Sequence, residues 1–228
     1  MGHDQRAHIA ALVVARGRCG RFDPLTPVGG VPMVVRAVSA LLDGIPRGAA
    51  DRCAVLGPPG RCAAYAEVCA DLPVDVYETF PAGAHAGQRA RAAGGDGEPS
   101  PLLVVHDALR PLTPPALVAS VVEAALARMA GPGPDAVVPV LPLTDTVKLV
   151  DAAGLVTGSP DRTGLRVLQT PHVLRGELLG SGEDPLTAAA RLAACGSVQA
   201  VAGDPMAFPV LTDWDLELAE LLAAGVRA

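Results

Sequence analysis

Short apolar runs rich in valine alternate, from Ile9 to Val140, with longer stretches whose apolar residues recur at helical spacing. Runs of this kind, bounded by Gly, Pro or Asp, are typical of buried strands. The expected strands are Ile9–Val14, Cys53–Leu56, Val74–Tyr77, Leu102–His106 and Ala136–Val140. The expected helices between them are Met33–Leu42, Arg61–Ala70 and Ala116–Met129. Regular alternation of strand and helix predicts an α/β fold with a doubly wound, mostly parallel sheet, whose functional loops follow the carboxyl ends of the strands.

The pattern changes beyond Val140. Two short extended runs, Thr146–Val150 and Leu165–Leu168, flank a region rich in Gly, Pro and Asp. This arrangement predicts a projecting β-arm over residues 143–168 rather than another crossover, and an arm needs a surface to pack against. The rest of the chain is expected to hold a helix beginning near Val173, a helix over Pro185–Ala194, a strand at Ser197–Val201 and a closing helix over Asp213–Ala224. Because no internal repeat or linker is visible, residues 1–228 are expected to form one domain.

Composition narrows the functional classes. Half of the residues are hydrophobic but only 3% are aromatic, so the core is expected to consist of aliphatic side chains and alanine. The net charge is −6 and the basic side chains are scattered, which argues against a nucleic-acid surface. No apolar run approaches the roughly 20 residues that span a membrane, and the N-terminus lacks a secretory signal, so we expect a cytoplasmic protein. The five cysteines lack the spacing of a metal or redox site and are interpreted as free thiols.

Residues able to handle phosphate groups gather after the fourth expected strand. Asp107 and Arg110 stand close together in the stretch Val105–Pro111, which reads VHDALRP. A carboxylate at a strand end can hold Mg²⁺ against phosphate oxygens, and a guanidinium can clamp a second phosphate with paired hydrogen bonds. A solvated turn at the end of a strand is the alternative interpretation. His106, inside the valine-rich strand, is interpreted as a hydrogen-bonded structural residue rather than a base.

The stretch Val105–Pro111 resembles the VHDAxRP motif of the 2-C-methyl-D-erythritol 4-phosphate cytidylyltransferases. Three further segments resemble motifs of that family and follow in its order: Asp145–Lys148 (DTVK), Asp161–Leu165 (DRTGL) and Leu168–Pro171 (LQTP). The resemblance implies a Rossmann-like nucleotidyltransferase fold. It also implies transfer of CMP from CTP to a polyol phosphate, 2-C-methyl-D-erythritol 4-phosphate, in the non-mevalonate route to isoprenoids, with Mg²⁺ as cofactor.

The resemblance also assigns the acceptor side of the site. It implies that Asp107 acts in catalysis and holds the metal, and that the polyol phosphate is bound by Arg110, Thr146, Arg162 and Thr170. In the family the arm exchanges across a two-fold dimer, and an arginine at the position of Arg162 reaches the partner's sugar-phosphate site. We therefore expect a homodimer, which would also give the arm a surface to pack against.

The nucleotide side departs from the family pattern. The family's loop AAGxGxRxGxxxPKQ corresponds to Val13–Pro27, where Ala15 stands at the first loop glycine and Cys19 at the arginine. When Pro24 is aligned with the motif's proline, Leu25 stands at the lysine. A second family lysine, in a KxT motif before the last helix, falls on Pro209. The small residues that the resemblance places at the nucleotide are Ala15, Gly17, Gly20 and Ala108.

Positive charge near the triphosphate must then come from arginine. Arg18 or Arg21 is expected to act in catalysis in place of the missing loop arginine, because both lie in a glycine-containing turn beside the expected triphosphate. Nucleotidyl transfer depends largely on positioned positive charge, so we expect weak activity. The family segment that holds cytosine corresponds to residues 82–89, where its spacing is lost, which leaves the base undetermined.

Two other functional hypotheses are open at this point. A catalytically degenerate paralogue could serve as a dimer that binds a sugar phosphate or a protein partner, as the loss of both lysines suggests. A Rossmann-type dehydrogenase is disfavoured, because no GxGxxG follows the first expected strand.

Overall fold

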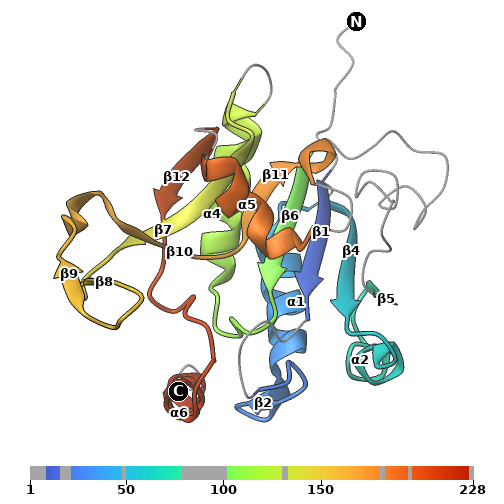
Figure 1. Cartoon of the computed structure of the whole chain (residues 1–228). Helices are drawn as coiled ribbons and strands as arrows, with labels where there is room; N and C mark the ends of the chain where they lie inside the picture. The colour runs from blue at the N-terminus through green and yellow to red at the C-terminus, as the bar shows by residue number, and fades with distance from the viewer. Residues whose placement is uncertain are drawn as a thin grey trace, which may run out of the picture.

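The computed structural model describes residues 9–15, 22–47, 50–78, 102–129, 133–179, 183–194 and 197–225. Eight strands of these residues form one central sheet (Figure 1). They are β1 (Ile9–Val14), β4 (Ala50–Gly57), β5 (Val74–Glu78), β6 (Leu102–Asp107), β7 (Ala136–Pro142), β10 (Arg166–Leu168), β11 (His172–Arg175) and β12 (Val198–Ala202). Neighbouring strands follow the order β12, β7, β11, β6, β1, β4, β5, and β10 pairs with the carboxyl end of β7.

Most of the strand pairs in this central sheet are parallel. β1 pairs in this way with β4 and β6, β4 pairs with β5, and β7 pairs with β12. The antiparallel pairs of this sheet all involve β10 or β11. β1, β4 and β6 end together, since Val14 lies opposite both Leu56 and Asp107. Their carboxyl ends therefore form one edge, which is where doubly wound sheets bind ligands.

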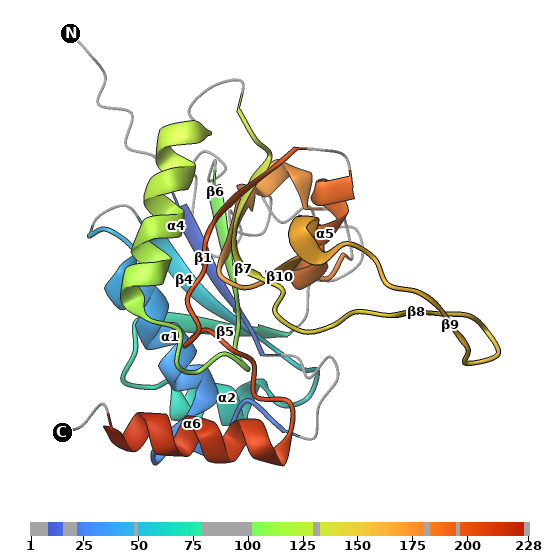
Figure 2. The same cartoon turned by 90° about the vertical axis from the view of Figure 1, so that its left-hand side faces the viewer.

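Helices cover both faces of the sheet (Figure 2). α1 (Met33–Gly44), α2 (Cys62–Val68) and α4 (Pro115–Arg128) pack on one face, and α5 (Pro185–Ala194) packs on the other. α1 and α4 approach each other closely at Gly44. A Cβ atom there would lie 2.5 Å from the carbonyl oxygen of Pro115, so this contact requires a residue without a side chain.

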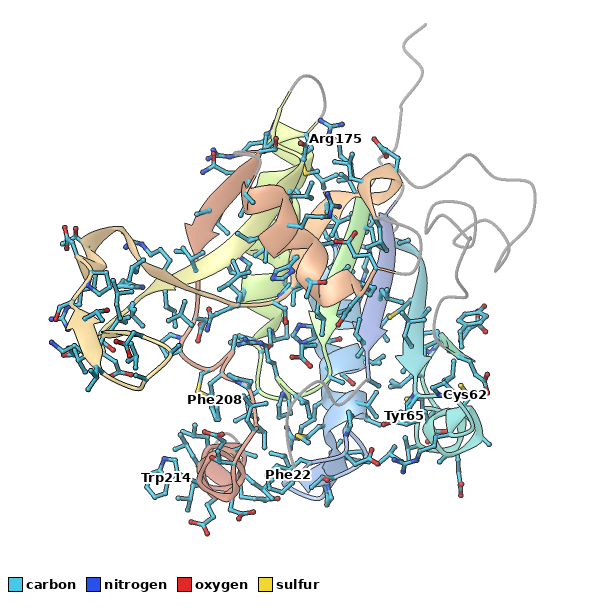
Figure 3. The ribbon with its side chains drawn as sticks, in the orientation of Figure 1. Phe22, Cys62, Tyr65, Arg175, Phe208 and Trp214 are labelled. Carbon is cyan, nitrogen blue, oxygen red and sulfur yellow. The ribbon has the colours of Figure 1, made fainter. Side chains whose placement is uncertain are left out.

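A small layer lies beyond the carboxyl edge of the sheet. It consists of the hairpin β2 (Pro27–Val28) and β3 (Val31–Pro32) together with α6 (Asp213–Gly225). Phe22 and Phe208 pack into the apolar cluster that this layer encloses, and Figure 3 shows both rings beside α6. The Gly29 N–H donates to the Glu220 carboxylate at 2.8 Å, which ties the hairpin to α6.

The predicted β-arm is present. β8 (Leu149–Val150) and β9 (Val156–Gly158) form an antiparallel ribbon, and a 3₁₀ turn, η1 (Arg162–Gly164), follows it. Figures 1 and 2 both show the arm projecting from the body of the molecule. Its apolar side chains are exposed, with Leu155 at 65% and Val156 at 64%.

The helix expected near Val173 is wrong. Val173 lies in β11, which is inserted between β6 and β7 and is followed by a 3₁₀ turn, η2 (Gly176–Leu178). An apolar run this short satisfies its backbone groups by pairing with strands on both sides, whereas a single turn of helix would leave most of them without partners. The two extended runs predicted for the arm also differ from the observed strands. Only residues 149–150 of the first run form a strand, and residues 166–168 of the second run pair with β7 in the central sheet.

The other expected elements are confirmed within three residues at each end. The strand predicted over Ile9–Val14 has the same bounds as β1, and the helix over Pro185–Ala194 has the same bounds as α5. Within the described ranges, no helix is long and apolar enough to cross a membrane. Cys53, Cys62 and Cys69 are free thiols, and the other two cysteines lie outside the described residues.

Candidate active site

Backbone groups meet where β1, β4 and β6 end. The N–H of Ala15 donates to the Leu56 carbonyl at 2.9 Å, and the N–H of Ala108 donates to the Val14 carbonyl at 3.1 Å. Both alanines are fully buried. Two of the predicted nucleotide residues, Ala15 and Ala108, are therefore fixed at neighbouring strand ends.

Asp107 and Thr170 lie together at the same edge. The backbone N–H of Asp107 donates to the Thr170 hydroxyl oxygen at 3.2 Å, and the Asp107 carboxylate accepts the Leu109 N–H at 2.9 Å. Thr170 is buried, because it precedes β11 and β11 pairs with β6. The fold thus brings together two predicted site residues that are 63 positions apart.

A buried histidine lies within hydrogen-bond distance of the Thr170 hydroxyl. His106 Nδ1 lies 2.8 Å from the Thr170 hydroxyl oxygen. Burial lowers the pKa of His106 to about 3 and that of His172 to about 4, and the positive charge of Arg110 acts in the same direction on both. His106 is therefore neutral at ordinary pH, which agrees with a structural hydrogen-bonding role rather than that of a general base.

Arg110 lies beside Asp107, and its guanidinium also contacts two backbone carbonyl groups. Its Nη1 donates to the Ala207 carbonyl, and its Nη2 lies 3.4 Å from the Leu168 carbonyl. Partial burial lowers the pKa of Arg110, and the Asp107 carboxylate opposes this effect. The guanidinium thus connects the segment before α6, at Ala207, to the end of β10, at Leu168. Its contact with substrate stays a prediction.

Gln169 has a role that the sequence did not reveal. Its amide accepts the Asp204 N–H at 2.9 Å and donates to the Asp204 carbonyl at 2.8 Å. A Cβ atom on Gly203 would lie 2.1 Å from Gln169 Oε1, so the two segments touch. Gln169 therefore holds the segment before α6 beside Thr170. The LQTP motif contained this residue and could have suggested it.

The remaining acceptor residues lie on the arm. Thr146 and Arg162 are both exposed, and Arg162 donates to the Thr144 carbonyl at 2.6 Å. The arm that carries them extends away from the carboxyl ends of β1 and β6 in both views (Figures 1 and 2). The fold of the single chain thus gathers Asp107, Arg110 and Thr170 and leaves the arm residues apart from them.

Comparison with known proteins decides the family. The model of the 2-C-methyl-D-erythritol 4-phosphate cytidylyltransferase family matches residues 9–224. The chain belongs to this family. It is 42% identical to the 2-C-methyl-D-erythritol 4-phosphate cytidylyltransferase of Nocardia farcinica, over 96% of this chain and 95% of that protein. Its identity to the enzyme of the same name from Rhodococcus jostii is 36%, over 96% of each chain.

A solved structure agrees with this result. The 2-C-methyl-D-erythritol 4-phosphate cytidylyltransferase of Thermus thermophilus superposes with a TM-score of 0.66 and 28% identity, over 94% of this chain and 98% of that one. The expected Rossmann-like nucleotidyltransferase fold is therefore confirmed.

Part of the family's nucleotide loop lies outside the described residues. This applies to Gly17, Arg18, Gly20 and Arg21, and also to residues 82–89. The end of the loop is described, and there Leu25 packs against the main apolar core. The polar side chain at this point is that of Asp23, whose Oδ1 accepts the Leu25 N–H at 3.0 Å.

The carboxylate at the sheet edge fits a metal ion that is coordinated partly by the protein and partly by substrate phosphates. Within the described ranges, no group of three or more His, Cys, Asp or Glu side chains could hold a metal ion by itself. Asp107 offers one carboxylate at the edge where phosphates are expected. Mg²⁺ commonly binds through one or two carboxylates, with substrate phosphates and water completing its coordination. A Mg²⁺ site of this shared kind is compatible with the family's chemistry.

Proposed function

We propose that the protein transfers the cytidylyl group of CTP to 2-C-methyl-D-erythritol 4-phosphate and releases pyrophosphate. The observation that carries this proposal is the family match over residues 9–224, together with an acceptor-side cluster at the sheet edge. Membership over nearly the whole chain favours an enzyme over a non-catalytic dimer. The reaction would take place in the cytoplasm.

The reaction requires positioning rather than a covalent enzyme intermediate. A phosphate oxygen of the acceptor attacks the α-phosphorus of CTP, a new phosphorus–oxygen bond forms, and the bond to the β-phosphate breaks with departure of pyrophosphate. Asp107 would hold Mg²⁺, which neutralises charge on the phosphates. Thr170 and Arg110 would orient the acceptor phosphate beside it.

Thr170 is suited to orient an acceptor because its hydroxyl is already fixed. The Asp107 N–H donates to the hydroxyl oxygen, and His106 Nδ1 lies 2.8 Å from the same oxygen. If the neutral imidazole donates from Nδ1, the hydroxyl proton is available for a phosphate oxygen. His106 would then prepare Thr170 without touching the substrate.

The nucleotide side lacks the two lysines of the family pattern. Arg18 or Arg21 would have to steady the triphosphate, since Leu25 and Pro209 stand at the positions of the family's lysines. A guanidinium can replace an ammonium only where its fork reaches the same oxygens. We therefore expect turnover below that of family members with both lysines.

We further propose a homodimer in which the arm packs on the partner subunit. Support comes from the exposed apolar residues of the arm, which include Leu149 at 54% and Val150 at 56%. Such side chains on a projecting ribbon favour a protein surface that covers them. Thr146 and Arg162 would then contribute to the partner's acceptor site. Light scattering that finds a monomer at micromolar concentration would exclude this arrangement.

Pyrophosphate release tests the proposed reaction. Purified protein with CTP, Mg²⁺ and 2-C-methyl-D-erythritol 4-phosphate should release pyrophosphate, and Asp107→Asn should abolish the release. Replacing the acceptor by ribitol phosphate, and CTP by other nucleoside triphosphates, would establish the substrate range. Absence of release with every pair would reject a nucleotidyltransferase activity.

A further inference from the structure

A second polar cluster lies on the nucleotide side of the sheet edge and consists of Asp23, Arg61 and Tyr65. Tyr65 is fully buried, and its hydroxyl lies 2.9 Å from Asp23 Oδ1 and 3.4 Å from the Ala15 carbonyl oxygen. Arg61 pairs with Asp23 Oδ2 through Nη1, and its guanidinium carbon lies 5.9 Å from the centroid of the Tyr65 ring. Figure 3 shows Tyr65 on the side of α2 that faces the sheet. We call these three residues the Asp23 cluster.

The Asp23 cluster connects two points that border the nucleotide loop. Ala15 directly follows β1, and Asp23 directly precedes Pro24, whose carbonyl accepts the Val34 N–H of α1 at 2.9 Å. The Tyr65 hydroxyl faces both the Ala15 carbonyl and the Asp23 carboxylate. The separation between the end of β1 and the approach to α1 is therefore set by a side chain of α2.

Protonation of the cluster is fixed over ordinary pH. Burial raises the pKa of Tyr65, and the hydrogen bond to Asp23 raises it further, so the phenol keeps its proton. Partial burial alone would raise the pKa of Asp23, but hydrogen bonds from Leu25, Arg61 and Tyr65 lower it overall. At neutral pH Tyr65 is thus a protonated phenol that donates to the Asp23 carboxylate.

Arg61 is placed by the turn that precedes α2. Gly60 has a φ of +76°, a conformation that residues with side chains rarely adopt, and its N–H donates to Glu78 Oε1 at 3.1 Å. Glu78 is the last residue of β5. The guanidinium therefore starts from a backbone position that is anchored to the sheet.

The polar contacts of the Asp23 cluster contribute little to the stability of the fold. An ion pair whose side chains are 48% and 32% exposed adds little to stability. A phenylalanine in place of Tyr65 would fill the same space with no hydroxyl to satisfy. By charge alone, Asp23 would weaken binding of a triphosphate. Any favourable effect of Asp23 on the nucleotide must therefore come from the geometry that it imposes.

We propose that Asp23, Tyr65 and Arg61 are positioning residues for CTP, which act by fixing the separation of Ala15 and Asp23 at the borders of the nucleotide loop. This inference rests on the proposed cytidylyl transfer. It assigns to α2 and the turn before it a role in nucleotide affinity, independent of the acceptor side.

The experiment is a calorimetric titration of CTP, with Mg²⁺ present, into the parent protein and three variants. Tyr65→Phe removes only the hydroxyl, and Asp23→Asn removes the charge. Glu183→Gln is the matched control, because Glu183 pairs with Arg191 at 2.7 Å, with side chains 16% and 47% exposed, in the segment that leads into α5. We expect the first two variants to weaken CTP binding about fivefold to tenfold, the loss typical of one hydrogen bond. The control should bind CTP like the parent.

Two further measurements separate positioning from general destabilisation. Melting temperatures of Tyr65→Phe and Asp23→Asn should stay within a few degrees of the control, and the KM for 2-C-methyl-D-erythritol 4-phosphate should not change. Asp23→Asn separates an electrostatic effect of Asp23 on CTP from a positioning effect. If Asp23 mainly repelled the triphosphate, removal of its charge would strengthen CTP binding. Tighter binding by Asp23→Asn, or unchanged binding by Tyr65→Phe, would overturn the inference.

The result for the parent distinguishes this inference from the proposed function. A parent that neither binds CTP nor releases pyrophosphate would reject both. A parent that binds CTP, with variants that bind it equally well, would reject the positioning role alone. If Tyr65→Phe does not fold, the partly exposed Asp23→Asn still decides the question.

Discussion

Replacing Arg110 by Ala should have two separable effects, one on stability and one on acceptor binding. The substitution removes a charged donor from the Ala207 carbonyl and a longer contact, at 3.4 Å, from the Leu168 carbonyl. Gln169 Nε2 also lies 3.3 Å from the Ala207 carbonyl, so that oxygen keeps a donor. A hydrogen bond from a charged group contributes about 1.5–3 kcal/mol, and the long contact adds little. We expect a loss of about 2 kcal/mol in the free energy of unfolding.

This loss should be visible without unfolding the protein. For a chain of this size, 1 kcal/mol shifts the melting temperature by about 2–4 °C, so Arg110→Ala should melt about 4–8 °C below the parent. Domains commonly have about 5–15 kcal/mol of stability, so the variant should remain folded at about 25 °C. Scanning calorimetry or circular dichroism would measure the shift. An unchanged melting temperature would mean that the contacts to Ala207 and Leu168 contribute nothing.

The second effect concerns the acceptor. If Arg110 also contacts the polyol phosphate, the same loss of about 1.5–3 kcal/mol corresponds to a KM for 2-C-methyl-D-erythritol 4-phosphate that is roughly 10- to 150-fold higher, with CTP affinity unchanged. Arg110→Lys keeps the charge but not the planar fork, so it should fall between the parent and Arg110→Ala. A lower melting temperature with an unchanged KM would make Arg110 a purely structural residue and would refute its place in the acceptor site.

Two further predictions concern pH and subunit exchange. The folded pKa values of His106 and His172 lie below the ordinary value of about 6.5, so the unfolded chain binds more protons than the folded chain between the folded and unfolded pKa values. This window runs from about pH 3 to 6.5 for His106 and from about pH 4 to 6.5 for His172. The free energy of unfolding should therefore be highest above about pH 6.5 and should fall as the pH is lowered through the window, by up to about 1.4 kcal/mol per pH unit for each histidine. Denaturant titrations of His172→Gln should show a shallower fall, and a slope equal to that of the parent would contradict the burial of His172. Mixing unfolded Asp107→Asn and Arg162→Ala, each expected to be inactive, and refolding them together should recover about a quarter of the parent activity, because half of the dimers then hold one intact composite site. No recovery would place Arg162 outside its partner's site.

Much of the fold follows from local sequence pattern. Central parallel strands are buried on both faces, so β1 and β6 read as continuous apolar runs, and their bounds could be predicted almost to the residue. β11 could not, because a short buried run has no periodicity that separates strand from helix. Its identity depends on the pairing of Val173 with Val104 and Val137, which are distant in sequence.

The candidate site likewise combines residues that local motifs indicate with contacts that only the folded chain creates. Asp107 and Thr170 could be proposed from the sequence because each lies in a compact motif at a strand end, and the fold brings them together. The engagement of Arg110 with Ala207 joins residues 97 positions apart, and that of Tyr65 with Asp23 joins residues 42 apart. No spacing rule connects such residues, since the contacts arise only when α2 and the segment before α6 pack at the sheet edge. The packing of Leu25, which is partly buried, likewise depends on the core that α1 forms with the sheet.

Phosphorus NMR of the complete reaction tests the proposed activity most directly. Purified protein would be incubated with CTP, Mg²⁺ and 2-C-methyl-D-erythritol 4-phosphate, with Asp107→Asn as the parallel sample. We predict that the signals of CTP decline while pyrophosphate and a cytidine diphosphate ester of the polyol appear in equal amounts, and that neither product forms with Asp107→Asn. CTP that remains intact, in a protein that still binds the polyol phosphate, would contradict catalysis and support a non-catalytic sugar-phosphate-binding dimer.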